Sequence, residues 1–174
     1  LVLGGSQAAR SFGELLPKVF KECKEKNINI KIFQQCIKSQ TEKLSEIYKR
    51  INFNFELFNF TNHISEYFLK TELAITRSGA SITAELINCN IPFISIPYPY
   101  AADSHQEKNA TYFEKKGYSH LVKEAEVNKK LFSLIESFYK DKKLLNQMID
   151  KQKKHSDREV FLKINKIIKN LINE

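Results

Sequence analysis

The chain has 174 residues, of which 42% are hydrophobic and 28% charged, a composition typical of one globular domain with a core of its own. Its net charge is +8, but the Lys residues are spread along the chain without interleaved aromatic residues, so we do not expect nucleic-acid binding. No apolar run approaches the roughly 18 residues of a membrane span, and we expect no signal peptide. The cysteines, Cys23, Cys36 and Cys89, form no CxxC pair, which favours structural thiols in a reducing compartment.

Strand-like and helix-like segments alternate along the chain. Short apolar runs predict six strands, at residues 1–3, 28–33, 53–58, 72–76, 91–96 and 118–122. Helical periodicity and polar boundaries predict helices at residues 12–23, 41–50, 62–69, 105–116, 128–139, 142–154 and 157–170. We expect Asn62 to cap one of these helices and Gly117 to end another. The alternation predicts a doubly wound, Rossmann-like α/β domain, in which a parallel sheet of about six strands carries helices on both faces.

One short segment, residues 76–85, organises the rest of the chain. It follows a buried strand, and Ile82, Leu86 and Cys89 after it form the apolar stripe of a helix. Ser78-Gly79-Ala80 is therefore a strand-to-helix turn, in which small residues let a ligand approach the backbone and the glycine allows a sharp turn. The free N–H groups and the dipole of the following helix make this turn a phosphate site.

A carboxylate accompanies this turn. Glu85 lies four residues after Ser81 and seven after Ser78, so we expect all three on one helix face, with the carboxylate leaning toward the turn. A carboxylate does not favour phosphate, but it can accept hydrogen bonds from a pair of sugar hydroxyls. Phosphate at the turn and ribose at Glu85 together predict a nucleotide.

Two more loops are expected at the carboxyl ends of strands, where such sheets bind ligands. Gly4-Gly5-Ser6 opens a helix after the first strand, so its N–H groups can cradle phosphate, although a plain tight turn would give the same pattern. It completes neither a Walker motif nor GxGxxG. The second loop, residues 97–103, is rich in proline and aromatic residues.

Three polar residues follow the proline-rich loop. The spacing of His105, Gln106 and Asn109 places them on one face of a helix. Amides on one face suit neutral hydroxyl groups, as a sugar requires, whereas a solvated helix face would give the same spacing.

Two other kinds of chemistry receive little support. A hydrolytic pair of Ser78 and His105 lacks the G-x-S-x-G nucleophile elbow. Metal binding is also not favoured, because none of the four histidines has a second His or Cys at ligand spacing. The histidines are His63, His105, His120 and His155.

Taken together, three motifs resemble the MurG family of glycosyltransferases. They are Gly4-Gly5-Ser6-Gln7-x-Ala9-Arg10, then Arg77-Ser78-Gly79-Ala80 with Glu85, then Asp103-x-His105-Gln106-x-x-Asn109-Ala110. That family transfers N-acetylglucosamine (GlcNAc) from UDP-GlcNAc to the MurNAc C4 hydroxyl of lipid I, which gives lipid II for peptidoglycan. The resemblance covers nearly the whole chain and implies one half of a GT-B fold. Residues 1–174 would be the donor-binding C-terminal domain, with a C-terminal helix at 157–174.

The resemblance also implies a role for each motif. The substrate-binding residues would be Gly5, Ser6, Gln7, Phe60, Thr61, Arg77, Ser78, Gly79, Ala80, Glu85, His105, Gln106 and Asn109. Ser6 and its neighbouring backbone would hold the diphosphate, with the Ala80 N–H assisting. Glu85 would take the ribose hydroxyls, and Gln106 and Asn109 the GlcNAc hydroxyls.

Phe60 and Thr61 would frame the uracil, Thr61 mainly through its backbone. Two positions depart from the family pattern. Ala8 stands where the family usually has Gly, and residues 34–37 lack the Gly that often follows that strand.

Cofactor and partner expectations follow from the same resemblance. UDP-GlcNAc would be the donor substrate, with no cofactor and no obligatory metal, because helix dipoles and N–H groups stabilise the leaving diphosphate. Lipid I and the catalytic base would belong to an amino-terminal domain that this chain, which opens inside a strand, does not contain. The whole protein would associate peripherally with the cytoplasmic face of the bacterial inner membrane.

Two alternatives share this fold. One is a non-catalytic UDP-GlcNAc-binding subunit that needs a membrane partner. The other is a UDP-GlcNAc 2-epimerase, which would use no lipid acceptor.

Overall fold

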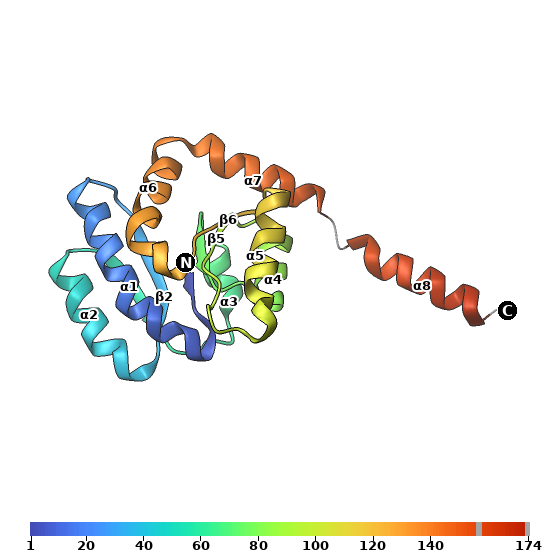
Figure 1. The fold of residues 1–174 in the computed structure, drawn as a ribbon, viewed down its shortest axis with the longest axis horizontal. Coiled ribbons are helices and arrows are strands. Elements are labelled where there is room, and N and C mark those ends of the chain that lie inside the picture. Colours follow the sequence, from blue (N-terminus) through green and yellow to red (C-terminus); the bar gives the residue numbers. More distant parts are fainter. Residues whose placement is uncertain (156–157, 173–174) are drawn as a thin grey trace.

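The structure, a computed structural model, describes residues 1–155 and 158–172. The predicted α/β class is confirmed: six parallel strands form one sheet in the order β3-β2-β1-β4-β5-β6 (Figure 1). The strands are β1 Val2–Leu3, β2 Lys31–Gln35, β3 Asn54–Phe58, β4 Ala74–Thr76, β5 Phe93–Ser95 and β6 Ser119–Leu121. From β1 the chain adds strands on one side and then returns to place β4 on the other, so β1 and β4 flank the topological switch point.

Helices follow the strands in sequence. They are α1 Gly5–Glu25, α2 Thr41–Arg50, α3 Ile64–Phe68, α4 Ala80–Asn88, α5 His105–Lys116, α6 Val127–Lys140, α7 Lys142–Lys154 and α8 Arg158–Ile172. Short 3₁₀ turns are η1 Lys38–Gln40, η2 Ala102–Ser104 and η3 Glu124–Glu126. None of the described helices is long and apolar enough to cross a membrane.

The sheet separates two hydrophobic clusters. The larger one joins α1, α2 and α6 to one face, with Phe12, Tyr48 and Leu131 fully buried. The smaller one joins α3, α4 and α5 to the other face around Phe93. Figure 1 shows the two sets of helices on opposite sides of the strands. Met148 of α7 belongs to the larger cluster, and the neighbouring Gln152 donates to the carbonyls of Ile91 and Tyr118.

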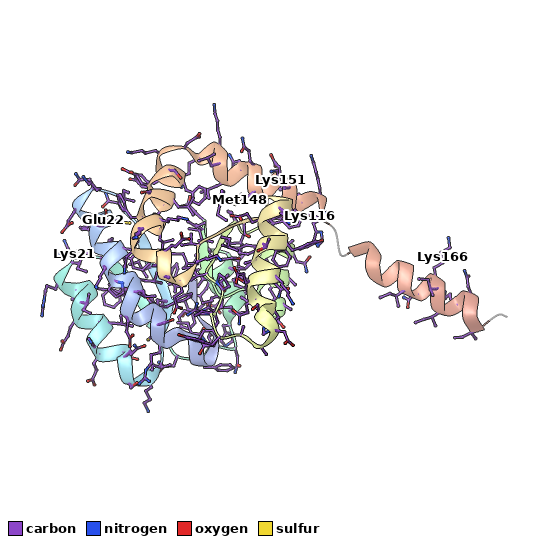
Figure 2. All side chains as sticks on the ribbon, in the orientation of Figure 1. Lys21, Glu22, Lys116, Met148, Lys151 and Lys166 are labelled. Atoms are coloured by element: carbon purple, nitrogen blue, oxygen red, sulfur yellow. The ribbon has the colours of Figure 1, made fainter. Side chains whose placement is uncertain are left out.

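The positive charge lies on several helices. Figure 2 shows Lys21, Lys116 and Lys151 on α1, α5 and α7 respectively, and all three are exposed. Some lysines pair within their own helix, such as Lys140 with Glu136 at 2.7 Å. Such exposed pairs add little stability.

Three predicted helices agree with the structure to the residue at both ends: 41–50, 105–116 and 142–154. Gly117 ends α5 with φ of 71°, as expected of a glycine C-cap. α1 begins earlier than predicted, because the residues after Gly4 are already helical. The predicted first residue of the last helix, Asp157, lies outside the described residues.

Other expectations were wrong. The strand predicted from Ile28 starts at Lys31, because the Ile28 N–H closes the end of α1 by donating to the Cys23 carbonyl. Asn62 does not cap a helix: α3 begins after His63, whose N–H donates to the Thr61 hydroxyl at 3.0 Å.

Cys89 is exposed at the end of α4 and is not a buried structural thiol. Leu86 and Ile87 are the residues of α4 that enter the core.

Candidate functional site at the carboxyl edge of the sheet

The three predicted loops all leave the carboxyl ends of strands. One follows β1 and another follows β4, and these two strands are neighbours in the sheet, with Leu3 opposite Thr76. The third loop follows β5, which pairs with β4 on its other side. The topology therefore brings the three motifs to one edge of the sheet, at its switch point.

The turn after β1 has a special backbone. Gly5 has φ of +68°, a conformation that side-chain-bearing residues rarely adopt, and a Cβ built there would meet no atom within 4 Å. Its N–H donates to Oε1 of Gln35, at the end of β2, with a distance of 3.1 Å. α1 begins at this residue, so the backbone N–H groups of its first turn have no acceptor within the helix.

The turn after β4 differs from the prediction. Gly79 has φ of −68° and ψ of 144°, which any residue can adopt, so the expected need for glycine in a sharp turn was wrong. A Cβ added there would meet only Ile82, at 3.9 Å. Neither conformation nor packing requires a glycine here, so the space above it is open to a ligand.

α4 begins at Ala80, directly after this turn. Ser81 and Glu85 are exposed and lie four residues apart in the helix, as predicted. Ser78 does not share their face: it precedes the helix and is fully buried. Its carbonyl accepts a hydrogen bond from Nδ2 of Asn109 at 3.1 Å.

The loop after β5 approaches α5 through side chains. Oε1 of Gln106 accepts from the Tyr98 N–H at 3.0 Å, and Nδ1 of His105 lies 2.8 Å from the Ala102 carbonyl. The side-chain amides of Gln106 and Asn109 therefore each tie a loop to α5 with one polar atom. The other polar atom of each amide, Nε2 of Gln106 and Oδ1 of Asn109, can bind a ligand.

The backbone before α5 is unusual. Asp103 and Ser104 have φ of 49° and 52°, although neither is glycine. Two consecutive left-handed residues store strain, and such strain is found most often at functional sites. Here they turn the chain so that α5 starts beside the loop.

Arg77 is the most buried charged residue of the motifs, with 4% of its surface exposed. Its guanidinium donates to the carbonyls of Ile96 and Pro97 and forms an ion pair with Glu124. These contacts connect the end of β4 to the end of β5 and to η3, so the Arg77 side chain is buried in the protein behind the ligand-facing turns.

A fourth group of residues lies at the end of β3. Phe60 is 80% exposed, and the Thr61 hydroxyl is used within its own turn. The preceding Asn59 donates from Nδ2 to the Cys36 carbonyl at 2.9 Å, and its own carbonyl accepts from Nε2 of Gln35. Gln35 thus links the turn at Gly5 to the loop at Phe60.

The side chains of Ser6, Gln7, Ala8 and Ala9 lie outside what the structure describes, although their backbone is part of α1. Sequence reasoning did not single out Gln35, Asn59, Ser11 or Glu124. These residues act on segments distant in the chain, and such contacts leave no local pattern.

The described residues can be compared with the arrangements that a hydrolytic pair and a metal site would need. Ser78 is fully buried and His105 is exposed with its Nδ1 directed to a carbonyl, so the two form no Ser–His pair. Among the described residues, no three His, Cys, Asp or Glu side chains gather as metal ligands.

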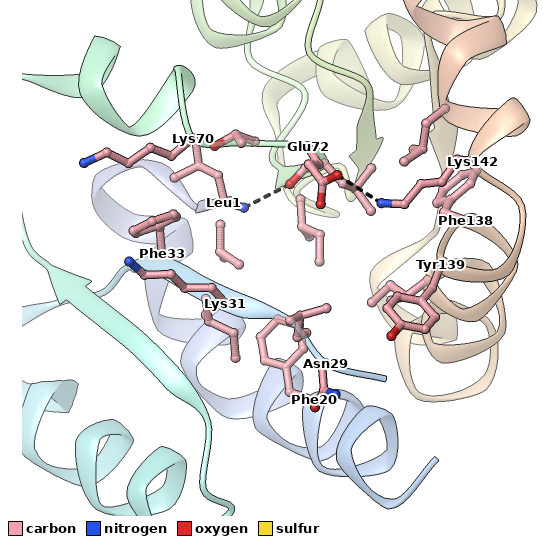
Figure 3. A pocket seen from close by; sticks show the side chains of 18 residues that line it. Leu1, Phe20, Asn29, Lys31, Phe33, Lys70, Glu72, Phe138, Tyr139 and Lys142 are labelled. Atoms are coloured by element: carbon pink, nitrogen blue, oxygen red, sulfur yellow. Dashed lines mark hydrogen bonds and ion pairs between the residues drawn. The ribbon is translucent and has the colours of Figure 1, made fainter. Parts of the chain in front are cut away.

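One cavity lies at the opposite edge of the sheet, at the amino ends of the strands. It measures about 460 Å³ and is lined by apolar side chains such as Phe20 and Phe138 (Figure 3). The amino group of Leu1 donates to the Leu73 carbonyl there at 2.9 Å, and Lys142 pairs with Glu72 at 3.1 Å. None of the three motifs lines it.

Comparison with known proteins identifies the family. A sequence profile of the glycosyltransferase family 28 C-terminal domain matches residues 1–163. The chain belongs to this family. Membership agrees with the resemblance drawn from the three motifs.

Curated relatives support the same assignment. A protein of Pelagibacter ubique (strain HTCC1062) is 39% identical over 130 residues, and one of Rickettsia bellii (strain RML369-C) is 36% identical over 141 residues. Both are named UDP-N-acetylglucosamine--N-acetylmuramyl-(pentapeptide) pyrophosphoryl-undecaprenol N-acetylglucosamine transferase. The matches cover 75% and 77% of this chain but only 36% and 40% of the relatives, so the chain spans about two fifths of their length.

The fold is shared with a solved structure. The crystal structure of Acinetobacter baumannii MurG superimposes with a TM-score of 0.83 at 22% sequence identity, and covers 97% of this chain and 51% of that one. This likeness confirms that the family 28 domain described here has the architecture of one half of that protein.

Proposed function

We propose that this domain binds UDP-GlcNAc as the donor half of an inverting glycosyltransferase, which moves GlcNAc to lipid I and forms lipid II. The observation that carries the proposal is the meeting of two small-residue turns, each opening a helix, at the switch point between β1 and β4. Backbone N–H groups and helix dipoles converge there, as a diphosphate requires. The names of the curated relatives support the choice of sugar and acceptor.

Each part of the donor has a place in this proposal. The diphosphate lies over the turns at Gly5 and Gly79, where, among the described side chains, an added Cβ would meet only Ile82 at 3.9 Å from Gly79. The ribose hydroxyls donate to Glu85. Nε2 of Gln106 donates to a GlcNAc hydroxyl and Oδ1 of Asn109 accepts from one, since the other ends of these amides already bind the protein.

Uracil stacks near the exposed ring of Phe60, beside the backbone of Thr61. The reaction leaves UDP as a charged product. Preorganised N–H donors stabilise the negative charge that develops on the leaving diphosphate, and this proposal involves no obligatory metal or cofactor.

The acceptor side lies beyond this domain. The chain spans about two fifths of its curated relatives. We therefore propose that lipid I and the general base are bound by another part of the protein, and that the whole enzyme acts peripherally on the cytoplasmic face of the bacterial inner membrane.

Calorimetric titration of the chain with UDP-GlcNAc and with ATP tests the donor assignment. UDP-GlcNAc should bind measurably more tightly, and the chain alone should not transfer the sugar to lipid I. Equal affinity for both nucleotides would contradict the uridine assignment.

A further inference from the structure

Arg77 joins four segments that are far apart in the sequence. Nη1 donates to the carbonyls of Ile96 and Pro97, at 3.0 and 3.1 Å, where β5 ends. Nη2 donates to the hydroxyl of Ser11 in α1 and forms an ion pair with Glu124 in η3, just after β6. One guanidinium therefore connects the ends of β4 and β5, the turn after β6 and the first helix.

The Arg77 guanidinium is buried among polar and aromatic side chains. Oγ of Ser11 also donates to Oε2 of Glu124 at 3.2 Å, so the three side chains bond to one another in a ring. The guanidinium carbon lies 4.4 Å from the ring centroid of Phe12 and 5.5 Å from that of Tyr98. Planar contact with rings and several fixed hydrogen bonds are properties of Arg that Lys does not reproduce.

Two sets of contacts connect this ring of side chains to the ligand-facing turns. Ser11 lies six residues after Gly5 in the same helix, so holding Ser11 also holds the start of α1. On the other side, Tyr98 contacts the guanidinium and donates its N–H to Gln106 of α5. The turn at Gly5 and the amide of Gln106 are thus connected, through Ser11 and Tyr98, to the same guanidinium.

We propose that Ser11 and Glu124 are positioning residues, which act through Arg77 to hold the phosphate turn and the sugar-facing helix at the separation that one nucleotide-sugar requires. A ligand with a diphosphate at one end and a sugar at the other needs both sites at once, although neither Ser11 nor Glu124 touches it. This inference rests on the proposed function, because it assigns the two turns to two parts of the same ligand.

If Arg77 and Glu124 only stabilised the fold, affinity for the ligand should follow stability in every variant. A buried ion pair can often be replaced by apolar side chains of similar size without loss of stability. The double variant Arg77→Met/Glu124→Leu should therefore be more stable than Glu124→Leu alone, in which the buried guanidinium loses its carboxylate. It should not regain ligand affinity if the bonds to Ile96, Pro97 and Ser11 are what position the turns.

The test compares Glu124→Gln with Glu126→Gln. Glu126 lies in the same 3₁₀ turn, but pairs with Lys130 at 2.7 Å near the surface, so its change removes a carboxylate without touching Arg77. Calorimetry with UDP-GlcNAc measures affinity, and NMR of the ligand-free protein measures the backbone amide signals of Gly5 and Tyr98.

Glu124→Gln should weaken UDP-GlcNAc binding by about tenfold, the scale of coupling through a packed network. It should also shift both amide signals, whereas Glu126→Gln leaves affinity and signals unchanged. The double variant should melt at a higher temperature than Glu124→Leu and still bind weakly.

Recovery of affinity together with stability in the double variant would overturn the inference, and so would unchanged amide signals in Glu124→Gln. Absence of UDP-GlcNAc binding by the unmodified chain would refute the proposed function instead. In that case the two amide signals still decide whether Glu124 holds both turns.

Discussion

The two edges of the sheet differ in how their side chains are used. At the carboxyl edge, Gln35, Gln106 and Asn109 all hydrogen-bond to the backbone of neighbouring turns, and the surface above Gly79 is open. At the amino edge, a cavity of about 460 Å³ lies between mostly apolar walls (Figure 3). This cavity is thus not where the motifs meet, and the proposed donor site is an open surface of N–H donors and amides, not an enclosed pocket.

The largest expected effect on UDP affinity comes from a larger side chain at Gly79, on the carboxyl edge. Gly79→Thr suits the backbone angles and remains an acceptable N-cap, so stability should hardly change. Its side chain fills the space proposed for the diphosphate, and we expect UDP affinity to fall by about 2–3 kcal/mol, the upper range for overpacking a fitted site. Calorimetry and thermal melting measure the two quantities separately.

The control for Gly79→Thr is a bulky residue at the other edge. Asn29→Trp places a large side chain at the lining of the amino-edge cavity and should leave UDP binding unchanged. If Asn29→Trp weakens binding and Gly79→Thr does not, the assignment of the two edges is reversed.

Glu85→Ala should weaken UDP binding by about 1–3 kcal/mol, because hydrogen bonds from the ribose to a charged acceptor are lost. The fold should remain intact, since Glu85 is exposed on α4. Glu46→Ala, an exposed carboxylate on α2, gives the same change of net charge and should have no effect. A collapse of thermal stability with unchanged affinity per folded molecule would make Glu85 a structural residue.

A smaller effect separates sugar from nucleotide. Gln106→Ala and Asn109→Ala should weaken UDP-GlcNAc binding by about 1 kcal/mol more than UDP binding, one neutral hydrogen bond each. Both changes also remove a bond that holds a loop, to the Tyr98 N–H or the Ser78 carbonyl, so some loss for UDP itself is expected.

Glu85→Ala is the internal reference for this pair, because it should affect both ligands alike. Equal losses for UDP and UDP-GlcNAc in both amide variants would mean that α5 only supports the loops and does not contact the sugar.

The local sequence contained enough information for the fold class and for the helices with polar or glycine boundaries. Gly117 and the apolar stripes of α2 and α7 act within one element, so their effect can be read from spacing alone. The three motifs were also placed at one sheet edge, because parallel strands fix where loops emerge.

The interactions that organise the site were not predictable in the same way. Gln35 and Glu124 act on partners 30 and 47 residues away, at Gly5 and Arg77. Gly79 was misread because its backbone angles turned out to be ordinary, which only a structure can show. Such contacts depend on the packing of the whole sheet and leave no periodic trace.

The smallest expected effect concerns folding and not binding. His120 lies in the middle of β6, its ring 5.3 Å from that of Phe138, and burial is the main cause that lowers its pKa from the ordinary value of 6.5. Nearby Lys151 lowers the pKa further, while Glu114 opposes the shift. The unfolded chain therefore binds a proton more readily than the folded one, so the free energy of unfolding should decrease as the pH falls through about 6.5.

Thermal melting between pH 5 and pH 8 tests this linkage. His120→Gln should flatten the acid side of the profile, because it removes the group whose pKa is lowered by folding. Because His120 belongs to neither ligand-facing turn, its variant should not alter UDP affinity at pH 8, where the imidazole is neutral in both states. A change in UDP affinity at that pH would instead connect β6 to the carboxyl-edge site and weaken the separation between folding and recognition.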